Sequence, residues 1–131
     1  MPRKIRQFSQ RSLNNLKGVD SRLVVVASLA LNQSPFDFIV TEGLRTKARQ
    51  VQLKKQGKTR TLRSRHLTGH AIDIAVLTRA KKVTWEFAYY QQVADKFKEI
   101  AAAHGIPIEW GGDWKSFKDG VHFQIRRGKS R

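Results

Sequence analysis

Two histidines and two aspartates, in separate parts of the chain, have the residue types and spacing of a metal site. His66 and Asp73 lie seven positions apart, and His122 follows Asp119 by three. Two histidines and one aspartate can hold Zn²⁺ in tetrahedral geometry, with the fourth position left for water. The remaining carboxylate, Asp119, can act as the general base that takes a proton from that water. The pattern therefore predicts a zinc hydrolase site with His66, Asp73 and His122 as ligands.

The spacing of His66 and His70 invites comparison with the helical H-E-x-x-H zinc motif, in which two histidines share a helix face. Leu67 stands where that motif has glutamate, and Gly69 would weaken a helix. A loop that enters a strand explains the segment better, because the residues after it alternate with a two-residue period. His70 falls on the same face as the isoleucines of that strand. We therefore interpret it as a packing or supporting histidine and not as a ligand.

Two predicted strands would position the other ligands. The first runs from His70 to Val76, with its isoleucines on the core face and Asp73 on the other face. The second runs from Val121 to Arg126 and places His122 on the face opposite its apolar residues. Each strand thus presents one predicted ligand on the side that is not packed on the core.

The rest of the chain reads as helices and strands that alternate along the sequence. The predicted elements are a helix from Asp20 or Ser21 to about Asn32, a strand from Phe36 to Thr41, a helix from Thr46 to Lys55 closed by Gly57, a helix capped by Thr84 and running to His104, with Phe87, Tyr90 and Phe97 among its buried residues, and a strand from Ile106 to Trp110. His104 would favour the negative end of the helix dipole, so we do not interpret it as a ligand. The pattern predicts an α+β fold, a small sheet with helices packed on one side.

The composition fits one globular domain. The chain has 131 residues, of which 40% are hydrophobic and 27% charged, enough for a single modest core. We expect one domain spanning residues 1–131, with short basic termini at 1–8 and 126–131. The absence of cysteine excludes disulfide bonds and thiolate metal sites. Zinc would therefore have to be held by histidine and aspartate.

The net charge of +16 supports a competing hypothesis. Between Arg45 and Arg65 the chain has nine lysines or arginines and no acidic residue. Such density is typical of nucleic-acid-binding proteins. Bacterial envelopes are also polyanionic, and the same long-range force attracts a cationic enzyme to them. Because a hydrolase site is present, we favour envelope attraction, and we expect a monomer with no stable nucleic-acid partner.

A longer motif makes the hydrolase hypothesis more specific. The pattern Ser64-x-His66-x-x-Gly69-x-Ala71-x-Asp73 resembles the signature of the zinc D-Ala-D-Ala metallopeptidases, the group that contains VanX- and VanY-type enzymes. At about 5% usage per residue type, five fixed positions recur by chance at about one start in a few million. The resemblance implies the mostly antiparallel hedgehog/DD-peptidase architecture, with helices packed against a small sheet.

Two further segments are more similar to phage endolysins that cut the L-alanyl-D-glutamate bond of peptidoglycan than to the carboxypeptidases. These segments are residues 38–46 and 109–117, and the similarity extends from about Asp20 to Ile125. One departure is Val121, which stands where many relatives have proline. Val can hold the same extended conformation, so the predicted site is unaffected.

The resemblance also implies roles for residues around the metal. Arg45 follows a predicted strand and would bind the oxyanion or a substrate carboxylate, which the fixed fork of arginine suits. Ser64 would bind substrate or orient the neighbouring ligand. Trp110 and Trp114 would either line the cleft or simply pack. The sequence leaves open whether Asp113 helps to hold a structural cation.

Three functions remain open on these grounds. The first is a zinc-dependent endopeptidase, a phage endolysin that hydrolyses the L-alanyl-D-glutamate bond of the peptidoglycan stem peptide. The second is a D-Ala-D-Ala carboxypeptidase or dipeptidase with the same metal chemistry, and the third is a basic nucleic-acid-binding protein without catalysis. No export signal is recognisable at the N-terminus. The resemblance therefore implies synthesis in the host cytoplasm and action at the wall after a holin-type lesion.

Overall fold

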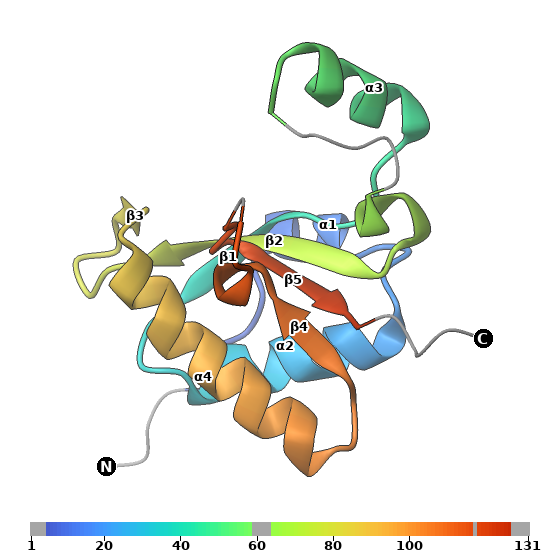
Figure 1. Ribbon diagram of the computed structural model, residues 1–131. Helices are drawn as coiled ribbons and strands as arrows, with labels where there is room; N and C mark the ends of the chain where they lie inside the picture. The colour runs from blue at the N-terminus through green and yellow to red at the C-terminus, as the bar shows by residue number, and fades with distance from the viewer. Residues whose placement is uncertain (1–4, 59–63, 117, 127–131) are drawn as a thin grey trace.

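The sheet is built around strand β2, Ala71–Leu77, which pairs with β1, Phe38–Glu42, on one side and with β5, His122–Ile125, on the other. Strand β4, Ile108–Trp110, pairs with β5 at the edge of the sheet. The short strand β3, Val83–Thr84, pairs with the end of β2. The computed structural model describes residues 5–58, 64–116 and 118–126. Within these residues every strand pair is antiparallel, which confirms the predicted sheet type (Figure 1).

Two long helices cover one face of this sheet (Figure 1). They are α2, Ser21–Gln33, and α4, Phe87–Ala103, and they pack against each other as well as under the strands. The short helix α1, Gln10–Asn15, lies beside β1, and α3, Lys47–Lys55, extends away from the sheet. Two 3₁₀ turns, Arg65–Thr68 (η1) and Gly111–Asp113 (η2), flank the site described below.

The core lies between the sheet and the two long helices. Ile72 and Ile74 of β2 are fully buried there, as their two-residue spacing predicts. The ring of Phe97 from α4 stacks on that of Phe123 from β5, with the centroids 4.0 Å apart. The apolar face of each strand is thereby removed from water. The opposite face of the same strands is left to carry the polar residues.

Side-chain caps mark the starts of α2 and α3, and the cap of α2 was predicted. The side chain of Asp20 accepts a hydrogen bond from the Arg22 amide at the start of α2, and that of Thr46 accepts one from the Arg49 amide at the start of α3. His104 is the C-terminal cap residue of α4. In the described part of the chain, no helix is both long and apolar enough to cross a membrane.

The start of α4 differs from the prediction. Thr84 does not cap the helix, because it lies in β3 opposite Val76, and the helix begins at Phe87. The hydroxyl of Tyr90 donates to the Thr84 carbonyl at 2.6 Å and accepts from the Val76 amide at 3.0 Å, which ties β3 to β2. Phe87 was predicted to be buried, but 45% of it is exposed. Helix α1 was not predicted from the sequence.

Candidate metal centre

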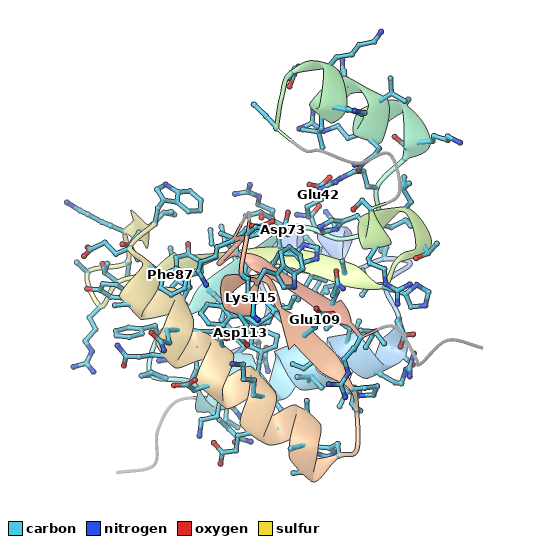
Figure 2. All side chains as sticks on the ribbon, viewed as in Figure 1. Glu42, Asp73, Phe87, Glu109, Asp113 and Lys115 are labelled. Atoms are coloured by element: carbon cyan, nitrogen blue, oxygen red, sulfur yellow. The ribbon has the colours of Figure 1, made fainter. Side chains whose placement is uncertain are left out.

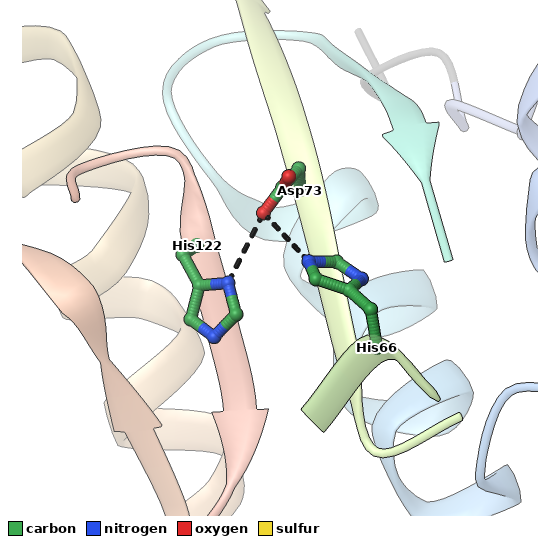
Figure 3. Close-up of side chains that lie close together, drawn as sticks. All are labelled: His66, Asp73 and His122. Atoms are coloured by element: carbon green, nitrogen blue, oxygen red, sulfur yellow. Dashed lines mark hydrogen bonds and ion pairs between the residues drawn. The ribbon is translucent and has the colours of Figure 1, made fainter. Parts of the chain in front are cut away.

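Three side chains converge on one point of the sheet (Figure 3). Oδ1 of Asp73 lies 3.1 Å from Nε2 of His66 and 3.2 Å from Nδ1 of His122. The three ligand atoms all lie within 4.8 Å of one another. Both histidines are buried, whereas Asp73 is only partly buried and so remains reachable from outside. The three predicted ligands are thus brought together from residues 56 positions apart in sequence.

Backbone geometry explains how they meet. Asp73 and His122 are directly opposite each other in the β2–β5 pairing, on the face away from the core. His66 reaches the same point from the η1 turn, which is capped by Ser64 at its start and by Gly69, with φ of 76°, at its end. The Ser64 hydroxyl accepts a hydrogen bond from the His66 amide, so Ser64 orients the segment that carries this ligand. Glycine suits the left-handed conformation that reverses the chain into β2.

The environment of His66 fixes which nitrogen faces the centre. Its Nδ1 lies 2.8 Å from the carbonyl oxygen of Gly43. A carbonyl can only accept, so Nδ1 carries the proton and donates it. The Nε2 lone pair is then directed at Asp73, and a neutral imidazole in this state is a metal ligand.

His122 is oriented by a chain of hydrogen bonds on the outer face of the sheet. Nε2 of Gln124 donates to Oε1 of Glu109 at 3.0 Å, which leaves Oε1 of Gln124 to accept from Nε2 of His122 at 2.8 Å. Trp114 donates from its indole nitrogen to Oε2 of Glu109 at 3.0 Å. The lone pair on Nδ1 of His122 therefore faces Asp73. The roles of Gln124 and Glu109 were not foreseen from sequence, although the two-residue period places Gln124 on the face of His122.

A cation fits this arrangement. With both histidines neutral, two lone pairs and a carboxylate oxygen, all acceptors, point at one another, which requires a positive charge between them. Tetrahedral zinc with bonds of about 2.0–2.1 Å would separate its ligand atoms by roughly 3.3 Å, close to the spacing of 3.1 and 3.2 Å. His66, Asp73 and His122 therefore form a group that could bind a metal ion.

The electrostatics of the group agree with that assignment. Burial raises the pKa of Asp73, but when a second proton on each histidine takes the place of the cation, hydrogen bonds from His122 and His66 outweigh burial and hold the pKa of Asp73 below its ordinary value. Burial lowers the pKa of His122, yet the hydrogen bond and the charge of Asp73 prevail and leave it raised. The centre therefore keeps a carboxylate at neutral pH and attracts positive charge.

Asp119 lies beside this centre at the turn into β5. Its amide donates to the Gly111 carbonyl at 3.0 Å, and its carbonyl accepts from the His122 amide at 3.1 Å. A side chain at Gly111 would collide with the Asp119 backbone, so the two segments pack closely. Burial and the negative charge of Asp73 raise the pKa of Asp119. A carboxyl group in that setting is suited to accept a proton.

Arg45 is buried on the other side of Asp73 and is held by several partners. Its Nε and Nη2 donate to the two carboxylate oxygens of Glu42 at 2.8 and 2.7 Å, and Nη1 donates to Oε1 of Gln50 at 2.6 Å. Nη2 also lies 3.8 Å from Oδ2 of Asp73, and Nη1 lies 3.5 Å from the Ser64 hydroxyl. The guanidinium is therefore fixed beside the centre. The bidentate pairing of Arg45 with Glu42 was not predicted from the sequence.

The two tryptophans separate into different roles. Trp114 lies with its ring 5.3 Å from that of His122, at the edge of the centre. Trp110, considered as a cleft residue, is only 2% exposed and packs in the core, with its indole nitrogen donating to the Gly120 carbonyl. Asp113 forms an ion pair with Lys98 at 2.7 Å, so the charge of its carboxylate is balanced by a side chain and no structural metal ion is needed there.

His70 lies apart from the three ligands, as predicted, but it does not pack in the core. Its Nδ1 contacts the Thr68 hydroxyl at 2.6 Å, and its Nε2 lies 3.7 Å from Oδ2 of Asp20. The ring is partly exposed, because strand β2 begins only at the next residue. His70 thus connects the start of α2 with the η1 turn.

Comparisons with known proteins agree with this geometry. A family model described as phage L-alanyl-D-glutamate peptidase matches residues 5–129. The L-alanyl-D-glutamate peptidase of Escherichia phage T5 is 32% identical over 126 residues, which cover 93% of this chain and 90% of that protein. The enzyme of the same name from Listeria phage A118 is 34% identical over 90% of this chain, but the matched region spans only 42% of that longer protein.

A bacterial relative and a solved structure extend the comparison. The peptidoglycan L-alanyl-D-glutamate endopeptidase CwlK of Bacillus subtilis is 34% identical over 68% of this chain and 60% of its own length. The crystal structure of the L-Ala D-Glu endopeptidase ChiX of Serratia marcescens superposes with a TM-score of 0.85 at 50% identity, over 91% of this chain and 89% of that one. This chain belongs to the phage L-alanyl-D-glutamate peptidase family.

Proposed function

We propose that this protein is a zinc-dependent peptidoglycan endopeptidase that hydrolyses the bond between L-alanine and D-glutamate in the stem peptide. The observation that carries the proposal is the convergence of His66, Asp73 and His122, with Asp119 beside them. The names of the related enzymes supply the scissile bond. Two histidines, one carboxylate and a water form a ligand set that catalytic zinc sites use.

The three ligands would hold the ion, and each is fixed by the fold. His66 is oriented by Gly43 and His122 by Gln124, so neither ring needs to turn before binding. Zn²⁺ supplies a Lewis acid that acidifies water and polarises a peptide carbonyl. Because the ligands are already in place, the positive charge of the ion would lie next to the carbonyl oxygen, where negative charge develops in the transition state.

Asp119 and Arg45 would perform the remaining tasks. Asp119 accepts a proton from the attacking water and passes it to the amine of D-glutamate as the peptide bond breaks. Its raised pKa favours holding that proton between the two steps. Arg45, fixed by Glu42 and Gln50, directs positive charge toward the substrate side of Asp73. A substrate carboxylate or the oxyanion is the group that it would stabilise.

The basic surface would attract the enzyme to the anionic bacterial envelope, where peptidoglycan lies. The net charge is +16, and the exposed residues of α3 contribute Lys47, Arg49, Lys54 and Lys55. Bacterial envelopes are polyanionic, so long-range attraction would raise the encounter rate and weaken with added salt. We propose that the protein acts as a monomer at the cell wall after release from the host cytoplasm, where it is made.

Product analysis tests the proposed reaction. Purified Gram-negative peptidoglycan is incubated with the protein, and the soluble products are identified by mass spectrometry. The proposal predicts peptides with a new N-terminal D-glutamate and glycans that retain L-alanine. His66→Ala should release none, whereas His104→Ala, a matched change at the exposed end of α4, should release as much as wild type. Release of D-alanine alone would assign a carboxypeptidase and contradict the proposal.

A further inference from the structure

An exposed apolar patch lies near the centre and has no role in the mechanism above. Val83, Trp85 and Phe87 are 46%, 68% and 45% exposed, although they lie within five consecutive residues. We call these three residues the aromatic platform. Large apolar side chains that gather on the surface commonly mark a binding site.

Val83, the strand residue of the platform, lies on the same face of the sheet as Asp73. Val83 is paired with Leu77 of β2, and cross-strand partners point to the same side. Leu77 and Asp73 are four residues apart on β2, so they also share a face. At about 3.3 Å per residue, Leu77 lies roughly 13 Å from Asp73 along the strand.

Phe87 is the platform residue that contacts the segment next to the centre. Its ring is the nearest contact that a side chain at Gly120 would meet, at 3.4 Å. Gly120 directly follows Asp119 and precedes the strand that carries His122. Phe87 therefore lies beside the segment that carries the proposed base.

Trp85 is held flat. Its ring stacks on that of Tyr90 with an interplanar angle of 11° and a centroid distance of 6.4 Å. Tyr90 is itself buried and fixed by hydrogen bonds to Val76 and Thr84. Because the indole lies parallel to this fixed ring and most of the residue is exposed, the tryptophan offers an aromatic surface to a ligand.

The opposite end of the site is polar and basic. Arg45 and the α3 helix lie beyond the start of β2, whereas the platform lies beside its end. In Figure 2, Glu42, the partner of Arg45, and Phe87 lie on opposite sides of Asp73. An extended substrate bound across Asp73 would therefore meet positive charge at one end and aromatic rings at the other.

The chemistry of the substrate matches this polarity. On the D-glutamate side of the scissile bond, the stem peptide carries free carboxylates, which suit the Arg45 end. On the L-alanine side, one residue and a lactyl group connect the bond to a pyranose ring. Two such units span about 7 Å when extended, so the ring centre lies on the order of 10 Å from the scissile carbonyl. Pyranose rings present C–H groups on their faces, which are attracted to the negative face of an indole.

We propose that the aromatic platform is a sugar subsite that binds the muramic acid ring, or its neighbour in the glycan strand, while the stem peptide is cut. This subsite rests on the proposed function, because it assigns the L-alanine side of the same cleft. Trp85 is its central residue, and Phe87 forms the wall toward Asp119. The enzyme would thus prefer stem peptides that are still attached to glycan.

The test compares two substrates that differ only in the sugar. One is the N-acetylated stem tetrapeptide, and the other is the same tetrapeptide on the disaccharide GlcNAc-MurNAc. For wild type, kcat/KM should be higher for the disaccharide substrate by about threefold to tenfold, the usual worth of one aromatic contact. Trp85→Ala should bring the ratio close to one while leaving cleavage of the free peptide within about twofold. Val25→Ala, a matched change at an exposed apolar residue of α2, should keep the wild-type ratio.

A second measurement separates the subsite from the reaction. The disaccharide without peptide is titrated into the protein, and the indole resonances are followed by NMR. A shift of the Trp85 signal that is absent in Trp85→Ala supports the subsite. If this shift is seen but neither substrate is cut, the subsite stands and only the proposed reaction is wrong. A wild-type ratio near one, or an equal fall on both substrates in Trp85→Ala, overturns the subsite. If Trp85→Ala lost binding to anionic lipid vesicles but kept the wild-type ratio of kcat/KM values, the patch would be a membrane contact, and the sugar subsite would also be overturned.

Discussion

Gln124 accepts the Nε2 proton of His122 at 2.8 Å, and this hydrogen bond decides which nitrogen of His122 faces Asp73. Gln124 is held in turn by Glu109 at 3.0 Å. Partners of this kind fix the ring of a metal-binding histidine and its tautomer. The orientation of His122 thus depends on residues outside the group that could bind a metal ion.

Gln124→Ala should weaken metal binding by about tenfold to 100-fold, because His122 loses its fixed tautomer. Competition with a chromogenic chelator measures the affinity without reference to activity. Gln92→Ala, on an exposed position of α4, is the matched control and should bind as wild type. Unchanged affinity in Gln124→Ala would show that the hydrogen bond does not orient the ligand.

Asp119→Asn should lower kcat by about 100-fold to 10,000-fold, because the amide cannot take a proton from water. The metal content should stay at the wild-type level, since Asp119 is not among the three ligands. Asp113→Asn breaks only the exposed pair with Lys98 and should retain activity. Stopped assays on the free stem peptide compare the rates, and a nearly active Asp119→Asn would assign the base elsewhere.

Arg45→Lys should reduce the free energy of unfolding by about 1–3 kcal/mol, because lysine cannot donate to both oxygens of Glu42 and also reach Gln50. Activity should fall as well, since the positive charge beside Asp73 is displaced. Urea unfolding monitored by circular dichroism gives the stability change. Arg49→Lys, on the exposed side of α3, should change neither quantity, and an equally stable Arg45→Lys would contradict the assigned network.

The N-terminal cap of α2 gives a prediction about acid stability. The hydrogen bond from Arg22 lowers the pKa of Asp20 to about 2 in the folded protein. Because the unfolded value is near 3.9, the stabilisation is complete above about pH 4 and is lost as pH falls toward 2. Asp20→Asn keeps the cap but not the charge. It should be less stable than wild type by about 0.5–1 kcal/mol at pH 7, and this gap should narrow between pH 4 and pH 2 in urea titrations. A gap independent of pH would be inconsistent with the lowered pKa.

The three candidate ligands could be predicted from sequence because Asp73 and His122 lie in strongly patterned strands and His66 lies in the motif before the first of them. Asp73 and His122 alternate with buried residues, so the two-residue period alone places them on the outer face. The supporting residues carry no such signal. Gln124 shares the face of His122, but only the fold brings Glu109 of β4 opposite it. Likewise, Glu42 meets Arg45 beyond the irregularity in β1 between Val40 and Glu42, which pairing with β2 reveals and the sequence does not.

Tertiary contacts also account for the errors. Thr84 has the residue type of a helix cap, but its pairing with Val76 draws it into a strand. Short helix α1 has little pattern of its own and is joined to the sheet by the Ser12 hydroxyl, which accepts from the Val40 amide. Local propensity cannot anticipate bonds between residues so distant in sequence.

The most direct test of the account is metal reconstitution. The protein is stripped with a chelator, and the rate of L-alanyl-D-glutamate cleavage is measured while Zn²⁺ is added. The stripped protein should have no activity, and activity should recover fully at one ion per chain. In His66→Ala and Asp73→Ala, tight binding and recovery should both be lost. A stripped protein that cuts the bond at the full rate would contradict the assignment of His66, Asp73 and His122 as the catalytic metal centre.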